Sequence, residues 1–433
     1  MDLLQYNQLH VHPASELNGT VTPPPAKSYS ARAILAATLA PGRSRIDNVA
    51  WSNNVRAMME CCEALGARLE PAGPSDIEIT GVARLNDGVT LSPGNSGIVL
   101  RLLMGATATN RGITFMTPFV DSLGRRANSE LVDALRQLGV VVSANGSDGR
   151  LPITLDGTAA HGGDLQISGR RSSQFLSGLL YLGGLLDEPL SITVTDELKS
   201  KSMVATTLTV LDTAGVRVTA DPDLMRHHVE PGTRFQPAHY VCGSDPASTA
   251  GLLAVAAAVK STVELRHHGL QELGGVLDYL RDIGVSVTAS DSALQVNGGA
   301  DLRPMDFDGS QAPDAVLPLA ALAAHADGTS RFYNIEHIRY KECDRISDFR
   351  RELERAGIDC DEKRDELIIH GSSRGVPGDV VVESHYDHAV VLAMTVVALR
   401  SQSGLTIKDP QYVAQTYPEF FQDLQNIGGT VTA

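Results

Sequence analysis

Apolar and polar positions along the chain repeat as one pattern about every 70 residues. Each copy opens with an apolar helix that follows a small polar residue, and continues with a short β-rich segment, an amphipathic helix closed by glycine, and one or two strands. The spacing is too long for the common solenoid repeats. The pattern therefore predicts an α/β (α+β) fold of six βαβαββ repeats grouped three plus three. The expected helices, two per copy, are 28–40 and 54–65, 95–108 and 128–138, a helix that starts at 172–174 and 203–214, 248–259 and 270–283, 315–324 and 345–356, and 389–399 and 418–427.

The two chain ends complement each other. The last copy stops without its final strands, whereas residues 4–12 alternate between apolar and polar side chains as a strand does. We expect residues 4–12 to supply the missing strand, which joins the N-terminus to the C-terminal half of the chain. The predicted domains are then 25–241 and, discontinuously, 1–24 plus 242–433. The chain crosses between them near 18–25 and near 241–245, and two crossings favour a hinge.

One short stretch, 22–32, combines several features of an anion site. Prolines stiffen its approach, Lys27 and Ser28 stand at the start of the first expected helix, and Arg32 lies about one turn further along the same face. A helix N-terminus adds a partial positive charge and free N–H groups. The stretch therefore predicts an anion-binding site, although a capped helix with solvated cations remains open from this stretch alone.

Composition limits the partners. The chain has 433 residues, of which 42% are hydrophobic, which predicts a globular protein of two domains. Its formal charge of −15 argues against nucleic acid polymers and anionic membranes, so an anionic ligand requires a local gathering of basic residues. No stretch is long enough to span a membrane and no signal peptide is visible, so we expect a cytoplasmic protein, and a monomer. The five cysteines are scattered and not at zinc spacing, which favours reduced thiols and no metal site.

Several separated motifs resemble those of the enolpyruvyl transferase family, and within it the 5-enolpyruvylshikimate-3-phosphate synthase branch. The resemblance covers nearly the whole chain, and it implies two domains of three βαβαββ units each around an interdomain cleft. The motifs, in chain order, are Lys27-Ser28-Tyr29-Ser30-Ala31-Arg32, Gly94-Asn95-Ser96-Gly97 with Arg101, Arg126 ahead of 131–135, Ser172-Ser173-Gln174-Phe175-Leu176, Ser200-Lys201, Pro313-Asp314-Ala315, Lys341-Glu342-Cys343-Asp344-Arg345, Tyr386-Asp387-His388 and Thr416-Tyr417-Pro418.

The resemblance also implies roles for individual residues. Asp314 corresponds to the base that takes a proton from the attacking hydroxyl, and Glu342 and Lys27 to the groups that protonate the methylene carbon of phosphoenolpyruvate and steady the intermediate. Phosphoenolpyruvate is a co-substrate, and no cofactor or metal is implied. The implied acceptor-binding residues are Ser28, Arg32, Ser172, Ser173, Gln174, Ser200, Met203, His337 and Lys341. The implied phosphoenolpyruvate-binding residues are Lys27, Asn95, Gly97, Arg126, Gln174, Arg345 and His388.

The chain departs from the family pattern at four positions. Ala389 stands where the pattern has an arginine for the phosphoenolpyruvate carboxylate, and Gln415 where it has a lysine for the phosphate. On the acceptor side, Met203 replaces an aromatic residue and His337 an asparagine. Loss of a charged partner in a desolvated site commonly costs about 2 to 5 kcal/mol of binding. The departures favour a specialised relative with a different or modified acceptor.

Three functions remain open from the sequence. The first is carboxyvinyl transfer to shikimate 3-phosphate or to another small phosphorylated acceptor, such as a nucleotide in specialised metabolism. The second is a lyase or isomerase that acts on a shikimate-type phosphorylated ring without the donor, and the third is a non-catalytic binding protein. The family branch that acts on UDP-N-acetylglucosamine uses a cysteine in the loop at 117–127, and this loop has none. His385, Asp387 and His388 could be read as metal ligands, but a polar helix start is the better interpretation.

Overall fold

The computed structural model describes residues 3–270, 273–299 and 301–433. The chain divides at two places into the first unit, Pro25–Cys242, and the second unit, which joins the described residues up to Pro24 with Gly243–Ala433. Each unit has its own cluster of buried apolar side chains. Strand β2 (Glu16–Val21) ends shortly before the first boundary, and β14 (His239–Val241) shortly before the second. Residues 18–21, expected in a hinge, are thus part of a strand, because Leu17 and Val21 are buried on its inner face.

All three sheets of the first unit share one strand arrangement. In each, an edge strand runs parallel to its neighbour, and the remaining pairs are antiparallel. In spatial order the sheets are β14, β3 (Gly42–Asp47), β5 (Ile77–Gly81) and β4 (Arg68–Pro71); β6 (Thr90–Leu91), β7 (Ile113–Phe115), β9 (Arg150–Asp156) and β8 (Val141–Asn145); and β10 (Gly163–Ile167), β11 (Leu190–Val194), β13 (Arg226–Val229) and β12 (Val218–Ala220). In two of the sheets a helix joins the edge strand to its neighbour, α3 (Gly97–Ala106) between β6 and β7 and α5 (Gln174–Gly183) between β10 and β11, whereas β14 pairs with β3 from the far end of the unit.

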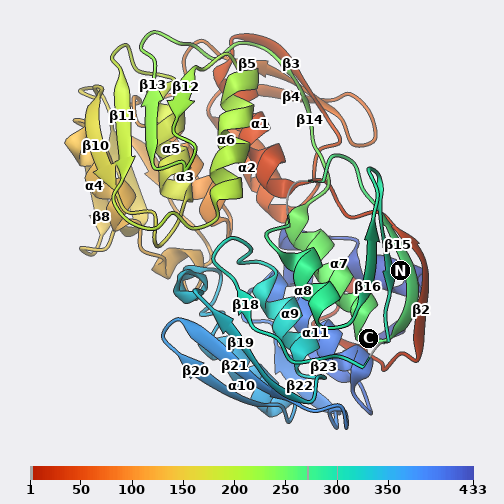
Figure 1. Ribbon diagram of the computed structural model, residues 1–433. Helices are drawn as coiled ribbons and strands as arrows, with labels where there is room; N and C mark the ends of the chain where they lie inside the picture. Colours follow the sequence, from red (N-terminus) through yellow and green to blue (C-terminus); the bar gives the residue numbers. More distant parts are fainter. Residues whose placement is uncertain (1–2, 271–272, 300) are drawn as a thin grey trace. The chain divides into compact units, whose positions relative to one another are not determined.

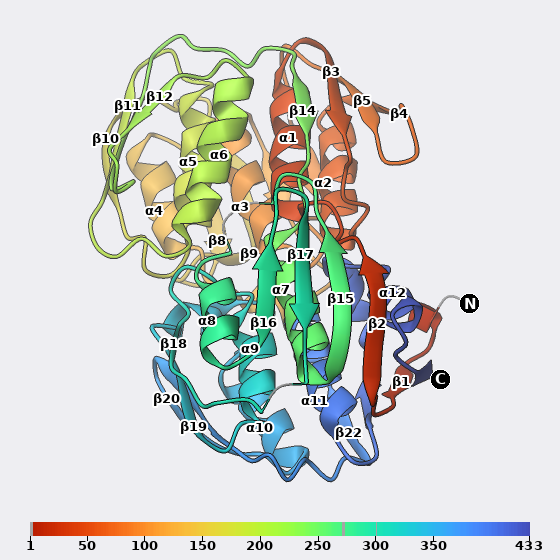
Figure 2. The same cartoon turned by 45° about the vertical axis from the view of Figure 1, so that its right-hand side comes forward.

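The second unit repeats this arrangement three more times, which confirms the six predicted βαβαββ repeats. Strand β1 (Gln8–Val11) completes the last sheet by pairing with β23 and β24, as the alternation at 4–12 predicts. Figure 2 shows β16, β17, β15 and β2 side by side. The sheets are β2, β15 (Lys260–Arg266), β17 (Ala293–Asn297) and β16 (Ser286–Ala289); β18 (Phe307–Asp308), β19 (Gly328–Tyr333), β21 (Glu366–Gly371) and β20 (Asp359–Lys363); and β22 (Val380–Glu383), β23 (Leu405–Lys408), β1 and β24 (Val431–Thr432).

Among the described residues, each unit has three central α-helices and three outer ones. Figure 1 shows how these helices are arranged within each unit. The central helices are buried almost all around, whereas the outer helices bury one face. In the first unit, Gly105 and Gly178 let two central helices touch, because a Cβ atom on Gly105 would lie 1.8 Å from the carbonyl oxygen of Gly178. The central helices are α1 (Lys27–Leu39), α3 (Gly97–Ala106), α5 (Gln174–Gly183), α7 (Pro246–Ala258), α9 (Val316–Ala323) and α11 (His388–Arg400). The outer helices are α2 (Asn53–Ala64), α4 (Ser129–Gln137), α6 (Lys201–Thr213), α8 (Val276–Asp282), α10 (Ser347–Arg355) and α12 (Phe420–Asn426).

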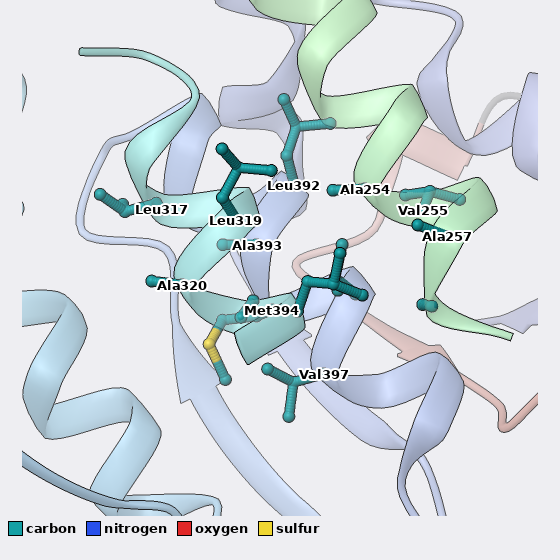
Figure 3. Packing of buried hydrophobic residues seen from close by; sticks show 14 of the residues in the cluster. Ala254, Val255, Ala257, Leu317, Leu319, Ala320, Leu392, Ala393, Met394 and Val397 are labelled. Atoms are coloured by element: carbon teal, nitrogen blue, oxygen red, sulfur yellow. The ribbon is translucent and has the colours of Figure 1, made fainter. Parts of the chain in front are cut away.

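The core of the second unit is built where α7, α9 and α11 meet. Figure 3 shows Val255, Leu319, Leu392 and Met394 among the apolar side chains gathered there. Because such a core holds the three helices in fixed register, their first residues are placed precisely. Short 3₁₀ helices at Leu3–Gln5, Leu123–Arg125, Glu336–Tyr340 and Pro410–Gln415 connect the regular elements.

One predicted helix is largely wrong. The sequence predicts helix over 270–283, but α8 begins only at Val276. Gly274 and Gly275 precede it with φ angles of 60° and 85°, which end any helix that would continue from the N-terminal side. Part of the predicted segment, 271–272, lies outside the described residues.

The five cysteines are free and buried. Burial raises the pKa of Cys62 to about 12, so this thiol stays protonated at neutral pH. Among the described residues, no helix combines the length and the apolar composition that crossing a membrane requires.

A buried histidine gives the second unit a pH-dependent stability. Burial lowers the pKa of His325 to about 3, with a further contribution from Arg400, whereas the unfolded value is 6.5. The folded state therefore loses stability as the pH falls below 6.5, by about 1.4 kcal/mol per pH unit. Between pH 6.5 and pH 5.0, we expect the free energy of unfolding of His325→Phe to fall by about 2 kcal/mol less than that of the wild type. Urea unfolding at the two pH values measures this difference. Equal losses in both proteins would contradict this assignment.

Candidate active site

A buried arginine organises the charged groups of the second unit. Nε and Nη2 of Arg345 donate to the two carboxylate oxygens of Asp387, at 2.7 and 3.0 Å. Nη1 donates to Asp314 at 2.5 Å, and Nη2 also donates to Glu342 at 3.1 Å. Burial alone lowers the pKa of Arg345, but the carboxylates of Asp387, Asp314 and Glu342 raise it well above its ordinary value. The expected base Asp314 and the expected acid Glu342 thus both accept hydrogen bonds from the guanidinium of Arg345.

The start of α11 holds Asp387 in place. Asp387 caps this helix, since its carboxylate accepts from the N–H of Ala389 at 2.8 Å. The two residues before it, His385 and Tyr386, both have left-handed φ angles, 51° and 63°. Such strain persists only where surrounding contacts impose it, and it is common at functional sites. Here the amide of Gln415 donates to the carbonyl oxygen of Tyr386 at 2.9 Å.

Glu342, Asp387 and His388 present ligand atoms within 4.8 Å of one another, so their geometry alone would suit a cation. The guanidinium of Arg345 already bonds both carboxylates. A metal ion would have to displace this buried arginine, whose positive charge neutralises the same oxygens. We therefore assign the three residues to an ion-pair network at a polar helix start.

A second buried arginine lies in the first unit. Arg32 is fully buried, and its Nη1 donates to the carbonyl oxygen of Ser28 at 2.8 Å. Its Nε donates to Thr207 at 2.7 Å, and its Nη2 to the carbonyl oxygen of Met203 at 3.1 Å. The resemblance assigns Arg32 to direct acceptor contact. Together with a bond from Nη2 to Ser177, these bonds use four of the five N–H groups, so among the described residues one N–H of Nη1 is left to donate to a ligand.

Arg101 arranges the polar residues at the start of α5. Its Nη1 donates to Gln174 at 2.8 Å and to Ser172 at 3.3 Å, and its Nε donates to Asn128 at 3.1 Å. The guanidinium also stacks over Phe175, with 4.7 Å between the guanidinium carbon and the ring centroid. The network fixes two expected ligand-binding side chains, Ser172 and Gln174, relative to α3.

Gly97, the first residue of α3, has side chains directly against it. A Cβ atom at this position would lie 2.8 Å from Nη1 of Arg126 and 3.3 Å from Oε1 of Gln174. The preceding Asn95 is buried and accepts from the N–H of Leu123 at 3.1 Å. The glycine is therefore needed for close approach and not for its backbone angle. Three of the residues expected to bind phosphoenolpyruvate, Gly97, Arg126 and Gln174, therefore lie together.

Comparison with known proteins decides the family. The family model for EPSP synthase (3-phosphoshikimate 1-carboxyvinyltransferase) matches residues 11–424. The chain belongs to the EPSP synthase family. It is 45% identical over 434 residues to a 3-phosphoshikimate 1-carboxyvinyltransferase from Burkholderia pseudomallei, covering 99% of this chain and 96% of the relative. It is 40% identical to one from Deinococcus radiodurans, covering 96% and 95%.

Solved structures share the fold of this EPSP synthase family member. The EPSP synthase from Acinetobacter baumannii matches with a TM-score of 0.81 at 23% identity, over 99% of this chain and all of that one. The enolpyruvyl transferase NikO from Streptomyces tendae matches with a TM-score of 0.78 at 17% identity, over 98% of each chain. The predicted enolpyruvyl transferase-like fold is thereby confirmed.

Two departures from the family pattern lie beside the Arg345 network. Ala389 is in the first turn of α11, next to Asp387, and is 1% exposed. Gln415 holds the turn that leads into Asp387. The carboxylates of Asp314, Glu342 and Asp387 and the single guanidinium of Arg345 sum to a formal charge of −2 (three negative, one positive). Because this chain lacks the cations that the family pattern has at 389 and 415, the summed charge of these four groups stays negative.

Most of the other predicted site residues lie at helix starts, whereas His337 lies within a 3₁₀ helix and Lys341 directly after it. Ser200 caps α6 with a left-handed φ of 53°, and Met203 lies in the first turn of that helix. His337 is buried in the 3₁₀ helix before Lys341, which is half-buried. Ser173 precedes α5, and Lys27 begins α1. That Lys341 joins Ser172, Ser173 and Ser200 around one phosphate stays a prediction.

Residues that act through other residues are mostly not evident from the sequence. The sequence predicts Asp387 as a helix start, but it is also the bidentate partner of Arg345. Arg101 was noted in a motif without a role, although an arginine inside the otherwise apolar helix α3 is a visible signal. Thr207 and Ser177, which hold Arg32, are ordinary helix residues in the sequence and gave no signal.

Proposed function

We propose that the chain transfers the carboxyvinyl group of phosphoenolpyruvate to a hydroxyl of shikimate 3-phosphate and releases phosphate. The observation that carries this proposal is 45% identity, over nearly the whole length of both chains, to a relative named 3-phosphoshikimate 1-carboxyvinyltransferase. The relatives are named for carboxyvinyl transfer, which favours transfer over the lyase or isomerase alternative. The gathering of Asp314, Glu342 and Arg345 supports the same reaction, because transfer needs a base, an acid and a cation together.

The reaction requires three proton transfers. Asp314 takes the proton of the acceptor hydroxyl as its oxygen bonds to C2 of phosphoenolpyruvate, while Glu342, with Lys27, supplies a proton to the methylene carbon. The resulting tetrahedral intermediate then loses phosphate as Glu342, now a carboxylate, takes a proton from the methyl group, which restores the vinyl group. Arg345 suits the stabilisation of negative charge in this sequence because its guanidinium is fixed before the substrates bind.

We also propose two domains, 25–241 and 1–24 plus 242–433, and a cytoplasmic monomer without a cofactor. The hinge expected at the crossings near 18–25 and 241–245 is restricted to 22–25 and 242–245, because 18–21 and 241 lie in strands. The residues at the chain crossings include the proline run 23–25, which stiffens one of them. Small phosphorylated substrates fit the helix starts, which carry Lys27, Ser173 and Ser200.

Titration calorimetry tests the function directly. Phosphoenolpyruvate is titrated alone and then in the presence of shikimate 3-phosphate or uridine monophosphate, and phosphate release is followed with the same pairs. We expect phosphoenolpyruvate binding to tighten with shikimate 3-phosphate, and phosphate to be released. Binding and turnover with uridine monophosphate, and none with shikimate 3-phosphate, would show that the acceptor is a nucleotide. A bound acceptor with no phosphoenolpyruvate binding would favour the lyase alternative.

Gly97→Ala provides a specific test of the donor residues. The added methyl group would lie 2.8 Å from the guanidinium of Arg126, so Arg126 must move. We expect the KM for phosphoenolpyruvate to rise about tenfold, the loss typical of one displaced charged contact. The KM for shikimate 3-phosphate, measured in the same assays, serves as the internal control and should change less than about twofold. An unchanged KM for phosphoenolpyruvate would contradict the placement of Arg126.

A further inference from the structure

Arg32 is a buried cation with only neutral partners in the described part of the chain. Its side chain is fully buried, and its bonds go to the hydroxyls of Thr207 and Ser177 and to backbone carbonyls. Burial lowers the pKa of Arg32 to about 10, while Tyr181 raises it slightly. Arg345, by contrast, is buried among three carboxylates. A buried charge without a counter-charge is costly, so its retention indicates a role beyond packing.

Two hydroxyls complete the contacts of this guanidinium. Oγ1 of Thr207 lies 2.7 Å from Nε of Arg32, 2.8 Å from Oγ of Ser177 and 3.0 Å from the carbonyl oxygen of Met203. Oγ of Ser177 lies 3.5 Å from Nη2 of Arg32. Two proton arrangements satisfy the set. Either Ser177 donates to Thr207 and Thr207 to the carbonyl oxygen of Met203, or Thr207 donates to Ser177 and Ser177 to the carbonyl oxygen of Ser173, 3.3 Å away; in both, the two hydroxyl oxygens accept from Arg32. Replacing either hydroxyl therefore leaves a buried donor unpaired.

The arginine in turn joins two helix starts. Its Nη1 bonds the carbonyl oxygen of Ser28 in the first turn of α1, and its Nη2 bonds that of Met203 in the first turn of α6. Lys27 begins α1, and Ser200 caps α6. The position of these groups relative to one another thus depends on one guanidinium, and that guanidinium depends on Thr207 and Ser177.

We propose that Thr207 and Ser177 are positioning residues for acceptor recognition, which fix Arg32 so that it ties the first turns of α1 and α6 together. The link to the acceptor rests on the proposed function, whereas the fixing of Arg32 does not. Neither hydroxyl needs to touch the acceptor.

Thr207→Val removes the hydroxyl and keeps the shape of the side chain. We expect its Kd for shikimate 3-phosphate, measured by calorimetry without phosphoenolpyruvate, to weaken about tenfold, while the KM for phosphoenolpyruvate changes less than about twofold. Thr207→Ser restores the hydroxyl and should restore the affinity. Thr107→Val is the matched control, because Thr107, the residue directly after α3, is also fully buried and its hydroxyl bonds the carbonyl four residues earlier. If Thr207→Val fails to fold, Ser177→Ala replaces it.

A second measurement separates this proposal from the proposed function. The Nε–H of Arg32 gives a nitrogen-15 NMR signal, assigned by its loss in Arg32→Lys, and its bond to Thr207 should protect it from exchange with water. We expect the signal to vanish in Thr207→Val and to persist in Thr207→Ser and Thr107→Val. A signal that persists in Thr207→Val, or a shikimate 3-phosphate affinity equal to wild type, overturns the proposal.

If the wild type does not bind shikimate 3-phosphate, the proposed function fails. The NMR signal then decides alone whether Thr207 fixes Arg32: its loss in Thr207→Val supports the fixing, and its persistence rejects it. The outcome for the acceptor and the outcome for Arg32 are therefore distinguishable.

Discussion

Asp314→Asn will lower the turnover of phosphoenolpyruvate and shikimate 3-phosphate by at least about 1,000-fold, because the amide cannot take the proton of the acceptor hydroxyl. The amide oxygen can still accept from Nη1 of Arg345, and Asp387 and Glu342 still neutralise that arginine. We therefore expect the Kd for shikimate 3-phosphate to stay within about twofold of wild type. Turnover is measured by phosphate release and affinity by calorimetry.

The control for this variant is Asp278→Asn. Asp278 also pairs with an arginine of the second unit, Arg281 at 3.0 Å, but it is exposed on an outer helix. Because exposed pairs contribute little, this variant should keep full turnover. Near wild-type turnover of Asp314→Asn would show that Asp314 is not the base.

Ala389→Arg combined with Gln415→Lys will tighten phosphoenolpyruvate binding by about 30-fold or more, the low end of what a partner in a desolvated ion pair contributes. The reason is the charge of the Arg345 network, whose three carboxylates exceed its one guanidinium. Two added cations bring these groups to neutrality and reduce the repulsion of an anionic donor. The measurement is the Kd for phosphoenolpyruvate in the presence of shikimate 3-phosphate.

The matched control carries neutral side chains of similar length, Ala389→Gln with Gln415→Met. It reproduces the steric change at both buried positions and the loss of the bond from Gln415 to Tyr386 without adding charge. We expect this control to bind phosphoenolpyruvate no better than wild type. Equal affinities in the charged and neutral double variants would show that the missing cations do not limit donor binding.

The repeat pattern predicted most of the fold because each repeat carries its own local signals. Apolar helices, glycine stops and alternating strands are short-range features, and the predicted α9 and α11 differ from the observed helices by one residue at each end. The pairing of β1 with the last sheet was also predicted, since the last copy lacked a strand and the N-terminus offered one. The predicted helix at 270–283 was wrong before Val276, because Gly274 and Gly275 adopt left-handed φ angles there. The periodicity of apolar residues does not reveal such a turn.

The sequence could also name the residues for the candidate site, but not their partners. The helix start within 22–32 indicated an anion site at Lys27, whereas the family resemblance implied the roles of Ser172 and Ser200. A bond such as that between Arg345 and Asp387, 42 residues apart, depends on how the segment before α10 is placed against the start of α11. The same holds for Arg32 and Thr207, which are 175 residues apart.

The sequence alone determined the repeat, the family, and the pairing of the N-terminal strand with the last sheet. These features follow from short periodic patterns and motifs. Only the tertiary structure decided which charges meet. It showed that Arg345 is shared among three carboxylates and that Arg32 is held by neutral groups alone in the described residues. The physical reason is that the neutralisation of a buried charge depends on side chains brought together by helix packing, and no local pattern along the chain encodes that contact.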